Sequence, residues 1–200
     1  MTIFSLIAIL LAVSVHEAAH AWMANRLGDP TARLSGRLTL NPFAHLDILG
    51  TVSLIFFGFG WGKPVPVDAY NLRYPRRDSA LISLAGPLSN IIFAAVISIF
   101  LKLFPIPYLL IPFVYSLVAV SLSLAFFNLL PLGPLDGAKI ILGVLSFEKA
   151  EAFEDFLERY GMVTLIFLLL PLFSGRSLID LFLSPVMDLI LRILIGGAKV

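Results

Sequence analysis

Two histidines four residues apart, His16 and His20, with Glu17 between them, form the pattern in this chain best suited to chemistry. Side chains four positions apart on a helix lie on the same face, so the two imidazoles can bind one Zn²⁺ ion. The glutamate can then reach a water molecule bound to that metal. The spacing predicts a catalytic metal site; the alternative is a histidine pair that hydrogen-bonds to neighbouring helices.

A catalytic zinc site needs a third protein ligand and an open position for water. The metzincin spacing is absent, since Met23 and Arg26 stand where that motif has glycine and histidine. Asp136 is the best distant candidate, because two prolines break the apolar segment before it and a helix can begin there. An unpaired carboxylate in such apolar surroundings is costly, and zinc is the simplest partner. The alternative is an aspartate that caps a helix at the membrane interface.

The composition is that of a membrane protein. Of the 200 residues, 59% are hydrophobic and 14% are charged, whereas an ordinary soluble domain has about 25% charged residues. The net charge of +1 gives no reason to expect a nucleic-acid partner. The chain contains no cysteine, which excludes disulfides, thiolate ligands and a cysteine nucleophile. Because the first apolar run contains His16, Glu17 and His20, we expect a retained span and not a signal peptide.

The elements that must position these residues are predicted to be helices. Residues 3–23 would span about 31 Å as a helix, close to the thickness of the hydrocarbon layer. Further spans are expected at 79–103 and 108–130, and a closing helical pair at 161–173 and 178–195. Residues 148–159 suit an amphipathic interfacial helix. The predicted fold is an all-α polytopic membrane protein with about five transmembrane helices, divided into a catalytic membrane core (1–145) and a C-terminal part (146–200).

A small membrane-associated β or re-entrant segment is expected after the first helix, over residues 31–62. Residues 31–40 alternate polar and apolar side chains, a period typical of a strand. Residues 48–61 are apolar but short and rich in glycine. At membrane depth such a backbone must pack on protein or line a wet cavity, so we predict a strand or re-entrant segment there.

Basic residues indicate the orientation. Seven lie between the first two predicted spans: Arg26, Arg33, Arg37, Lys63, Arg73, Arg76 and Arg77. The positive-inside rule places that side in the cytoplasm and the N-terminus outside. The predicted metal site then lies below the cytoplasmic surface and opens toward the cytoplasm.

A series of motifs resembles the site-2 protease family, the intramembrane zinc metalloproteases. His-Glu-Ala-Ala-His (16–20) is followed by Gly-Asp-Pro-Thr (28–31), Asn-Pro-Phe-Ala-His-Leu-Asp (41–47) and Ala-Gly-Pro-Leu-Ser-Asn (85–90). Asn128 then leads to Leu-Asp-Gly at 135–137. The motifs cover roughly residues 10–140. The chain resembles the small prokaryotic type, because no stretch is long or polar enough for a PDZ or CBS domain.

The resemblance implies a site and a reaction. His16, His20 and Asp136 would hold one Zn²⁺ per chain, and Glu17 would be the catalytic base. The enzyme would be an intramembrane zinc metalloendopeptidase, a hydrolase of regulated intramembrane proteolysis in a prokaryotic cell membrane. It would cleave peptide bonds within or near transmembrane segments of membrane-protein substrates, by Glu-assisted attack of zinc-bound water.

Further contacts with an oxyanion or with substrate are expected from Asn128, His45, Gly58 and Gly60. The two side chains are candidate donors, and the glycine segment could offer an extended edge to a substrate strand. The alternatives are a helix–helix hydrogen bond for Asn128, a histidine satisfied within a turn for His45, and glycines that only turn a loop. The oligomeric state is not predicted.

Two other functions fit the same ligands. A divalent-cation transporter could use His16, His20 and Asp136 as a transit site at membrane depth. A non-catalytic scaffold could use zinc only to hold helices together, with a closed fourth ligand such as His45. The absence of an internal repeat and of a second ligand set favours the protease.

Overall fold

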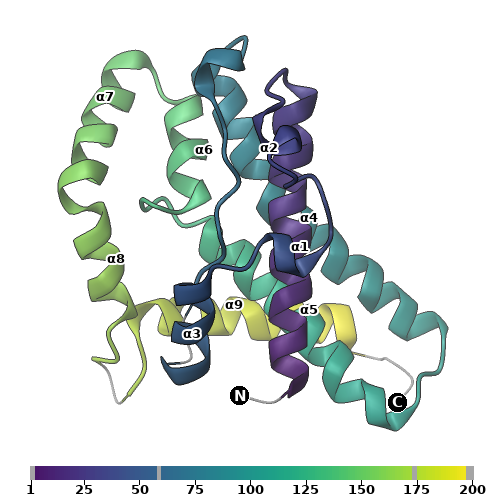
Figure 1. Cartoon of the computed structure of the whole chain (residues 1–200). Coiled ribbons are helices and arrows are strands. Elements are labelled where there is room, and N and C mark those ends of the chain that lie inside the picture. Colours follow the sequence, from purple (N-terminus) through teal and green to yellow (C-terminus); the bar gives the residue numbers. More distant parts are fainter. Residues whose placement is uncertain (1–2, 58–59, 173–174, 197–200) are drawn as a thin grey trace.

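Three long helices form the centre of the molecule (Figure 1). The computed structural model describes residues 3–57, 60–172 and 175–196. Helices α1 (Ile3–Arg26), α4 (Pro75–Leu103) and α5 (Ile111–Asn128) pack against one another, and the short η3 (Tyr108–Leu110) leads into α5. Within the described part of the chain, these three are the helices long and apolar enough to cross a membrane, the third counted from Tyr108. This confirms an integral membrane architecture built on helices.

Small residues let the central helices approach closely. Ala12, Ala21 and Ala24 of α1 and Ala94 of α4 are fully buried. Between membrane helices there is little hydrophobic driving force, so close backbone contact through small side chains supplies much of the packing energy. The larger apolar side chains of α4, among them Ile92, Val96 and Phe100, lie on the outer surface, as expected of helices that face lipid.

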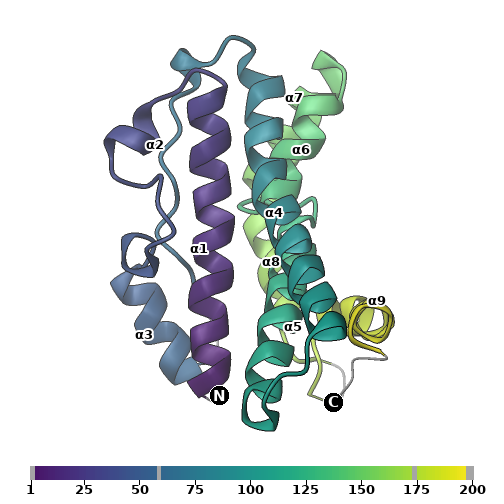
Figure 2. The ribbon, with the colours of Figure 1, turned by 90° about the vertical axis from the view of Figure 1, so that its right-hand side faces the viewer.

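The connection between α1 and α4 lies on the other side of α1 from α4 (Figure 2). It contains α2 (Thr31–Leu34), η1 (Pro42–Ala44), α3 (Ile48–Phe57) and η2 (Ala69–Asn71). Between α3 and η2 the chain returns along α1 without regular secondary structure (Figure 2). We call residues 60–68 of this return the strap. Leu72, just beyond η2, packs with Ala24 of α1 and Ile82 of α4.

The predicted strand at 31–40 is wrong. Residues 31–34 form the helical turn α2, and the following residues form turns. The Asp29 carboxylate accepts a hydrogen bond from the Thr31 N–H (3.0 Å), and the Ser35 N–H donates to the Thr31 carbonyl. Alternating polarity favours a strand only where a neighbouring strand can pair with it, and these residues satisfy their backbone locally.

The strand or re-entrant segment predicted for 48–61 is not confirmed either. Residues 48–57 form the helix α3, whose first turn is capped because Asp47 Oδ1 accepts the Gly50 N–H (2.8 Å). Gly58, which directly follows Phe57 in the predicted segment, lies outside the described residues. In the described part of the chain, β pairing occurs only as isolated bridges, one of them antiparallel between Leu46 and Gly62.

The C-terminal half wraps back around the centre. Helix α6 (Asp136–Val144) packs along α4, where Arg76 donates to the carbonyls of Leu142 (2.7 Å) and Leu145 (3.0 Å). Helix α7 (Phe147–Phe156) continues through the π-helical turn η4 (Leu157–Gly161) into α8 (Met162–Leu169), forming one rod in Figure 1. The final helix is α9 (Leu178–Ile195).

The prediction of about five spans is not confirmed. The second half of the expected closing pair, α9, contains Asp180, Asp188 and Arg192, and it is seen nearly end-on in Figure 2 while α1 runs vertically. Helix α8 has 8 residues, which is about 12 Å of helix. The rest of its rod, α7 and η4, is rich in charged residues, so the rod is not a predominantly apolar span. The periodic apolar face of α9 packs across the central helices instead of beside them: Met187 contacts the cluster formed by Ala94, Val118 and Leu122.

Candidate metal centre

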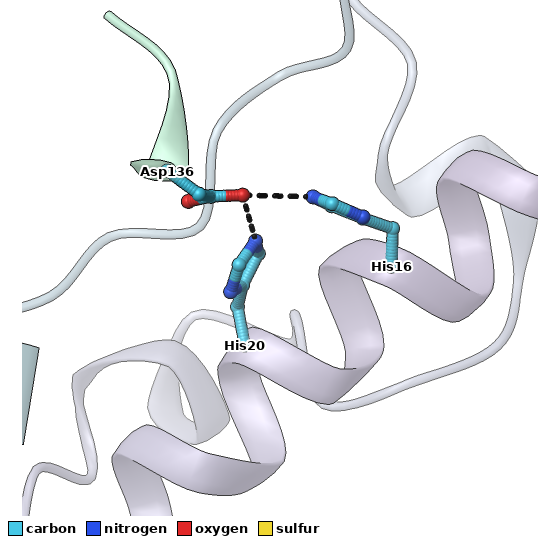
Figure 3. Close-up of side chains that lie close together, drawn as sticks. All are labelled: His16, His20 and Asp136. Carbon is cyan, nitrogen blue, oxygen red and sulfur yellow. Dashed lines mark hydrogen bonds and ion pairs between the residues drawn. The ribbon is translucent and has the colours of Figure 1, made fainter. Parts of the chain in front are cut away.

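The two histidines and Asp136 converge between α1 and the start of α6 (Figure 3). His16 Nε2 lies 3.1 Å from Asp136 Oδ2, and His20 Nε2 lies 3.2 Å from the same oxygen. Ligand atoms on a tetrahedron with bonds of about 2.05 Å are about 3.3 Å apart. Both distances therefore fit the edges of a tetrahedral zinc site, and the donor set of two imidazole nitrogens and one carboxylate is one that zinc accepts.

His20 is held in the orientation that a metal ligand requires. Its Nδ1 lies 2.7 Å from the carbonyl oxygen of Ile82 in α4 and donates to it, so Nε2, which is directed toward Asp136, is the ring nitrogen that remains to bind a metal. Histidines that bind metals usually donate their second ring N–H in this way, which fixes the tautomer and the ring orientation. The His16 ring stands edge-on to the His20 ring, at an interplanar angle of 85°.

Gly86 of α4 provides the space in which the two imidazoles meet. A Cβ atom at this position would lie 2.5 Å from His20 Cε1 and 2.7 Å from His16 Nε2, and it would contact His20 Nε2 even more closely. No side chain fits there without displacing a ring. The sequence indicated only that residues 85–90 belong to a motif, and the role of Gly86 beside the histidines became visible only in the structure.

Asp136 is positioned by the turn that precedes it. It is the first residue of α6, where the helix dipole favours a negative charge. A Cβ atom at Gly137 would overlap the carbonyl oxygens of Leu129 and Leu130, so this glycine lets the 129–135 loop close onto the start of α6. Burial raises the pKa of the Asp136 carboxyl, but the hydrogen bonds and charges of His16 and His20 outweigh burial and hold that pKa below its usual range. Asp136 is therefore a carboxylate at neutral pH.

Glu17 lies next to the histidines in sequence but faces a different neighbour. Its side chain is half-buried, and Oε2 accepts a hydrogen bond from the Val65 N–H of the strap (3.3 Å). Nothing in the sequence indicated that the strap would reach this glutamate, because the two residues are far apart along the chain.

The other predicted site residues are placed differently. His45 is fully buried, with Nε2 2.8 Å from the Thr39 carbonyl. Asn128 donates to the Leu124 carbonyl of its own helix (3.0 Å). A Cβ atom at Gly60 would overlap the Gly50 carbonyl of α3, so Gly60 is a packing contact of that helix. Gly58 lies outside the described residues.

Among the described residues, His16, His20 and Asp136 are the group of histidine and acidic side chains whose ligand atoms lie close enough together, all within 4.8 Å, to hold a metal ion. His45 does not belong to this group. The structure thus brings together the three ligands expected from the sequence, from two elements more than one hundred residues apart.

Comparison with known proteins points to one family. Residues 106–171 match the sequence model of peptidase family M50, and this segment includes Asp136. "Putative zinc metalloprotease YwhC" of Bacillus subtilis is 42% identical over 148 residues, which are 69% of this chain and 67% of that protein. "Putative zinc metalloprotease MJ0611" of Methanocaldococcus jannaschii is 31% identical over 139 residues, 70% of this chain and 69% of that protein.

A third relative, "Putative zinc metalloprotease Rip2" of Mycobacterium tuberculosis, is 32% identical over 136 residues, and the match spans 52% of its length. No solved structure is significantly similar to this chain. The identity to YwhC and MJ0611 extends over about two thirds of each protein and accompanies the metalloprotease motifs described above. The chain therefore belongs to peptidase family M50, the site-2 protease family, and is a membrane metalloprotease.

Proposed function

We propose that this metalloprotease hydrolyses peptide bonds within or near transmembrane segments of membrane-protein substrates. The observation that supports this most directly is the convergence of His16, His20 and Asp136 inside the packed centre of the candidate spanning helices. A site among such helices is reached most readily by a substrate that is itself embedded in the bilayer. The same ligand set, found once among the residues that the structure describes, supports one Zn²⁺ per chain.

Each residue of the site would have a separate role in the reaction. Zinc held by His16, His20 and Asp136 would polarise the scissile carbonyl and acidify a bound water. Glu17 would accept a proton from the attacking water at its free oxygen and deliver it to the nitrogen of the leaving amine. Gly86 would keep both imidazoles in place, and the Ile82 carbonyl would hold the tautomer of His20.

An oxyanion contact from Asn128 is part of this proposal, since its side-chain amide has a second N–H besides the one given to Leu124. His45 fits the alternative role better, because it is fully buried and its Nε2 is occupied by the Thr39 carbonyl. That contact stabilises the turn of residues 39–45, and the strap is hydrogen-bonded to this turn through the Lys63 N–H and the His45 carbonyl.

The orientation is also a proposal. Arg26 ends α1, and Arg76 and Arg77 lie in the first turn of α4, so basic residues gather where these two helices meet the connection between them. The positive-inside rule places this end in the cytoplasm of a prokaryotic cell and the N-terminus outside. The site would then open toward the cytoplasm.

The decisive experiment compares Glu17→Gln with Asp136→Asn in the purified, detergent-solubilised protein. We expect Glu17→Gln to keep its zinc, measured by elemental analysis, and to lose cleavage of a single-span test substrate by a factor of about 10² to 10⁴. We expect Asp136→Asn to lose both zinc and cleavage. A Glu17→Gln enzyme with the wild-type rate would remove Glu17 from the mechanism.

The two competing functions have separate tests. A transporter would carry zinc into sealed liposomes, whereas the protease would not. If zinc only held the helices together, the Asp136→Asn variant would unfold or aggregate. The proposed function requires instead that this variant remain folded, with an unchanged helical circular dichroism spectrum, while cleavage stops. The scaffold is also disfavoured because His45, its expected fourth ligand, does not belong to the group of described residues whose ligand atoms lie within 4.8 Å of one another.

A further inference from the structure

The strap donates a hydrogen bond to Glu17 from a backbone N–H whose two neighbouring residues have no N–H of their own. Val65 is flanked by Pro64 and Pro66, and proline has no N–H. The Val65 N–H is therefore the one backbone donor in this tripeptide, and it points to Glu17 Oε2 at 3.3 Å. The proline that follows also restricts Val65 to extended conformations, which fixes the direction of the donor.

The strap is fastened on both sides of this donor. On one side, the Lys63 N–H donates to the His45 carbonyl (2.8 Å). On the other side, the Asp68 N–H donates to Asp29 Oδ2 (2.8 Å). Gly62 also packs closely against α1, since a Cβ atom there would lie 3.2 Å from Val13 Cγ1. These contacts hold the strap along α1 and set the position of the Val65 N–H relative to Glu17.

One oxygen of Glu17 is engaged in this way, and within the described residues its side chain makes no second hydrogen bond. Glutamate side chains have high rotamer freedom, and ordering one costs up to about 2 kcal/mol. A fixed donor on one carboxylate oxygen removes part of that freedom before substrate arrives. The other oxygen is then presented in a defined direction.

We propose that the Val65 backbone N–H is a positioning group that orients Glu17 for catalysis, and that the two prolines serve to present this single donor. This inference rests on the proposed role of Glu17 as general base. It assigns a function to the Lys-Pro-Val-Pro-Val sequence of residues 63–67, which neither the metal site nor the packing of the helices explains. Val65 acts through Glu17 and is therefore a positioning residue, not a catalytic one.

Three variants distinguish the contribution of the Val65 N–H to catalysis from that of the Val65 side chain. Val65→Pro removes the donor but keeps the extended backbone, Val65→Ala removes only the side chain, and Val67→Pro makes the same substitution after Pro66. No hydrogen bond from the Val67 N–H is found in the described part of the chain. We expect Val65→Pro to lower kcat by about 10- to 100-fold with little change in KM or zinc content. In Val65→Ala and Val67→Pro, kcat should fall far less.

An equal loss of kcat in Val65→Ala and Val65→Pro would show that the side chain matters and would overturn the proposal. So would a Val65→Pro enzyme with normal kcat. A failure of the broader mechanism looks different, because Glu17→Gln would then retain activity whatever the behaviour of the Val65 variants.

Amide exchange tests the contact without relying on any change at Val65. In protein labelled with ¹⁵N-valine, the Val65 amide should exchange at least about ten-fold faster in Glu17→Ala than in the wild type, because the acceptor is removed. The buried Val118 amide of α5 serves as the internal reference and should not change. If Glu17→Ala leaves the Val65 exchange rate unaltered, the hydrogen bond does not form in solution and the inference fails.

Discussion

At the scale of single residues, the geometry of the candidate metal centre depends as much on the missing side chain of Gly86 as on His16, His20 and Asp136. Gly86 lies where α4 passes the two imidazoles, and any Cβ atom there would come within 2.7 Å of a ring atom of each histidine. The rings cannot retreat freely, because His20 is bound to the Ile82 carbonyl and both are packed between helices. A glycine is therefore required by the geometry of the ligands and not by backbone conformation.

Gly86→Ala should consequently impair metal binding while leaving the ligands unchanged. We expect its zinc affinity, measured by competition with a chromogenic chelator, to fall by about 10- to 100-fold, the loss seen when the support of a ligand is disturbed. Gly161→Ala is a matched control, since the nearest atom to its Cβ would be at an ordinary distance of 3.4 Å. Unaltered zinc affinity in Gly86→Ala would mean that the helices separate without cost.

At the scale of elements, Asp29 connects the end of α1 to the far end of the strap. It is fully buried, and its carboxylate accepts hydrogen bonds from the Thr31 N–H (3.0 Å), the Asp68 N–H (2.8 Å) and the Asn71 side chain (2.9 Å). Burial raises the pKa of Asp29, but these hydrogen bonds outweigh burial and lower it. The Gly-Asp-Pro-Thr motif is thus a structural junction: within the described part of the chain, Asp29 accepts hydrogen bonds from the connection between α1 and α4.

This junction gives the fold a defined pH dependence. A carboxyl whose pKa is lower in the folded than in the unfolded state stabilises the fold above its unfolded value of about 3.9, and this stabilisation is lost as the pH falls through the folded value. Asp29→Asn has one acceptor oxygen fewer and should be less stable at pH 7 by about 1–3 kcal/mol. The difference in Tm from the wild type should shrink as the pH is lowered from 7 to about 3.

Asp155→Asn, a change at an exposed position of α7, should show no such difference at any pH. A deficit in Asp29→Asn that stays constant between pH 7 and pH 3 would contradict this account. In that case the loss would come from shape or packing and not from the charge of the carboxylate.

At the scale of the whole molecule, the position of α9 decides how many times the chain crosses the membrane. Lys102, at the end of α4, donates to the Ile193 carbonyl near the end of α9 (3.0 Å). The last turn of α9 therefore lies at the level where α4 ends. A closing pair of spans would have carried it to the opposite side, where α4 begins.

Because the chain contains no cysteine, single-cysteine labelling can test this arrangement directly. Arg192→Cys on α9 should react with a membrane-impermeant maleimide from the same side as Phe104→Cys, which lies just after α4. Ser146→Cys, beside the start of α4 through the Arg76 contacts to Leu142 and Leu145, should react from the other side. Labelling of Arg192→Cys together with Ser146→Cys would support five spans.

The spanning helices and the candidate metal ligands of this protein could be predicted from the sequence alone. The composition and three apolar runs predicted helices that cross a membrane, because length and hydropathy are properties of each segment by itself. His16, Glu17 and His20 were recognisable for the same reason: a spacing of four on one helix brings the histidine side chains together whatever surrounds them. Asp136 was expected as the third ligand from its chemistry and from family resemblance.

Other features were decided only by tertiary structure, since they depend on contacts between segments distant along the chain. The alternating residues 31–40 had no partner strand and formed a helical turn and loop, and α9 lay across the bundle because its charged residues and apolar face suit that position. The clearance at Gly86 and the Val65 hydrogen bond to Glu17 arise where α4 and the strap pass α1. No local pattern specifies such a meeting, because it is fixed by how the elements pack.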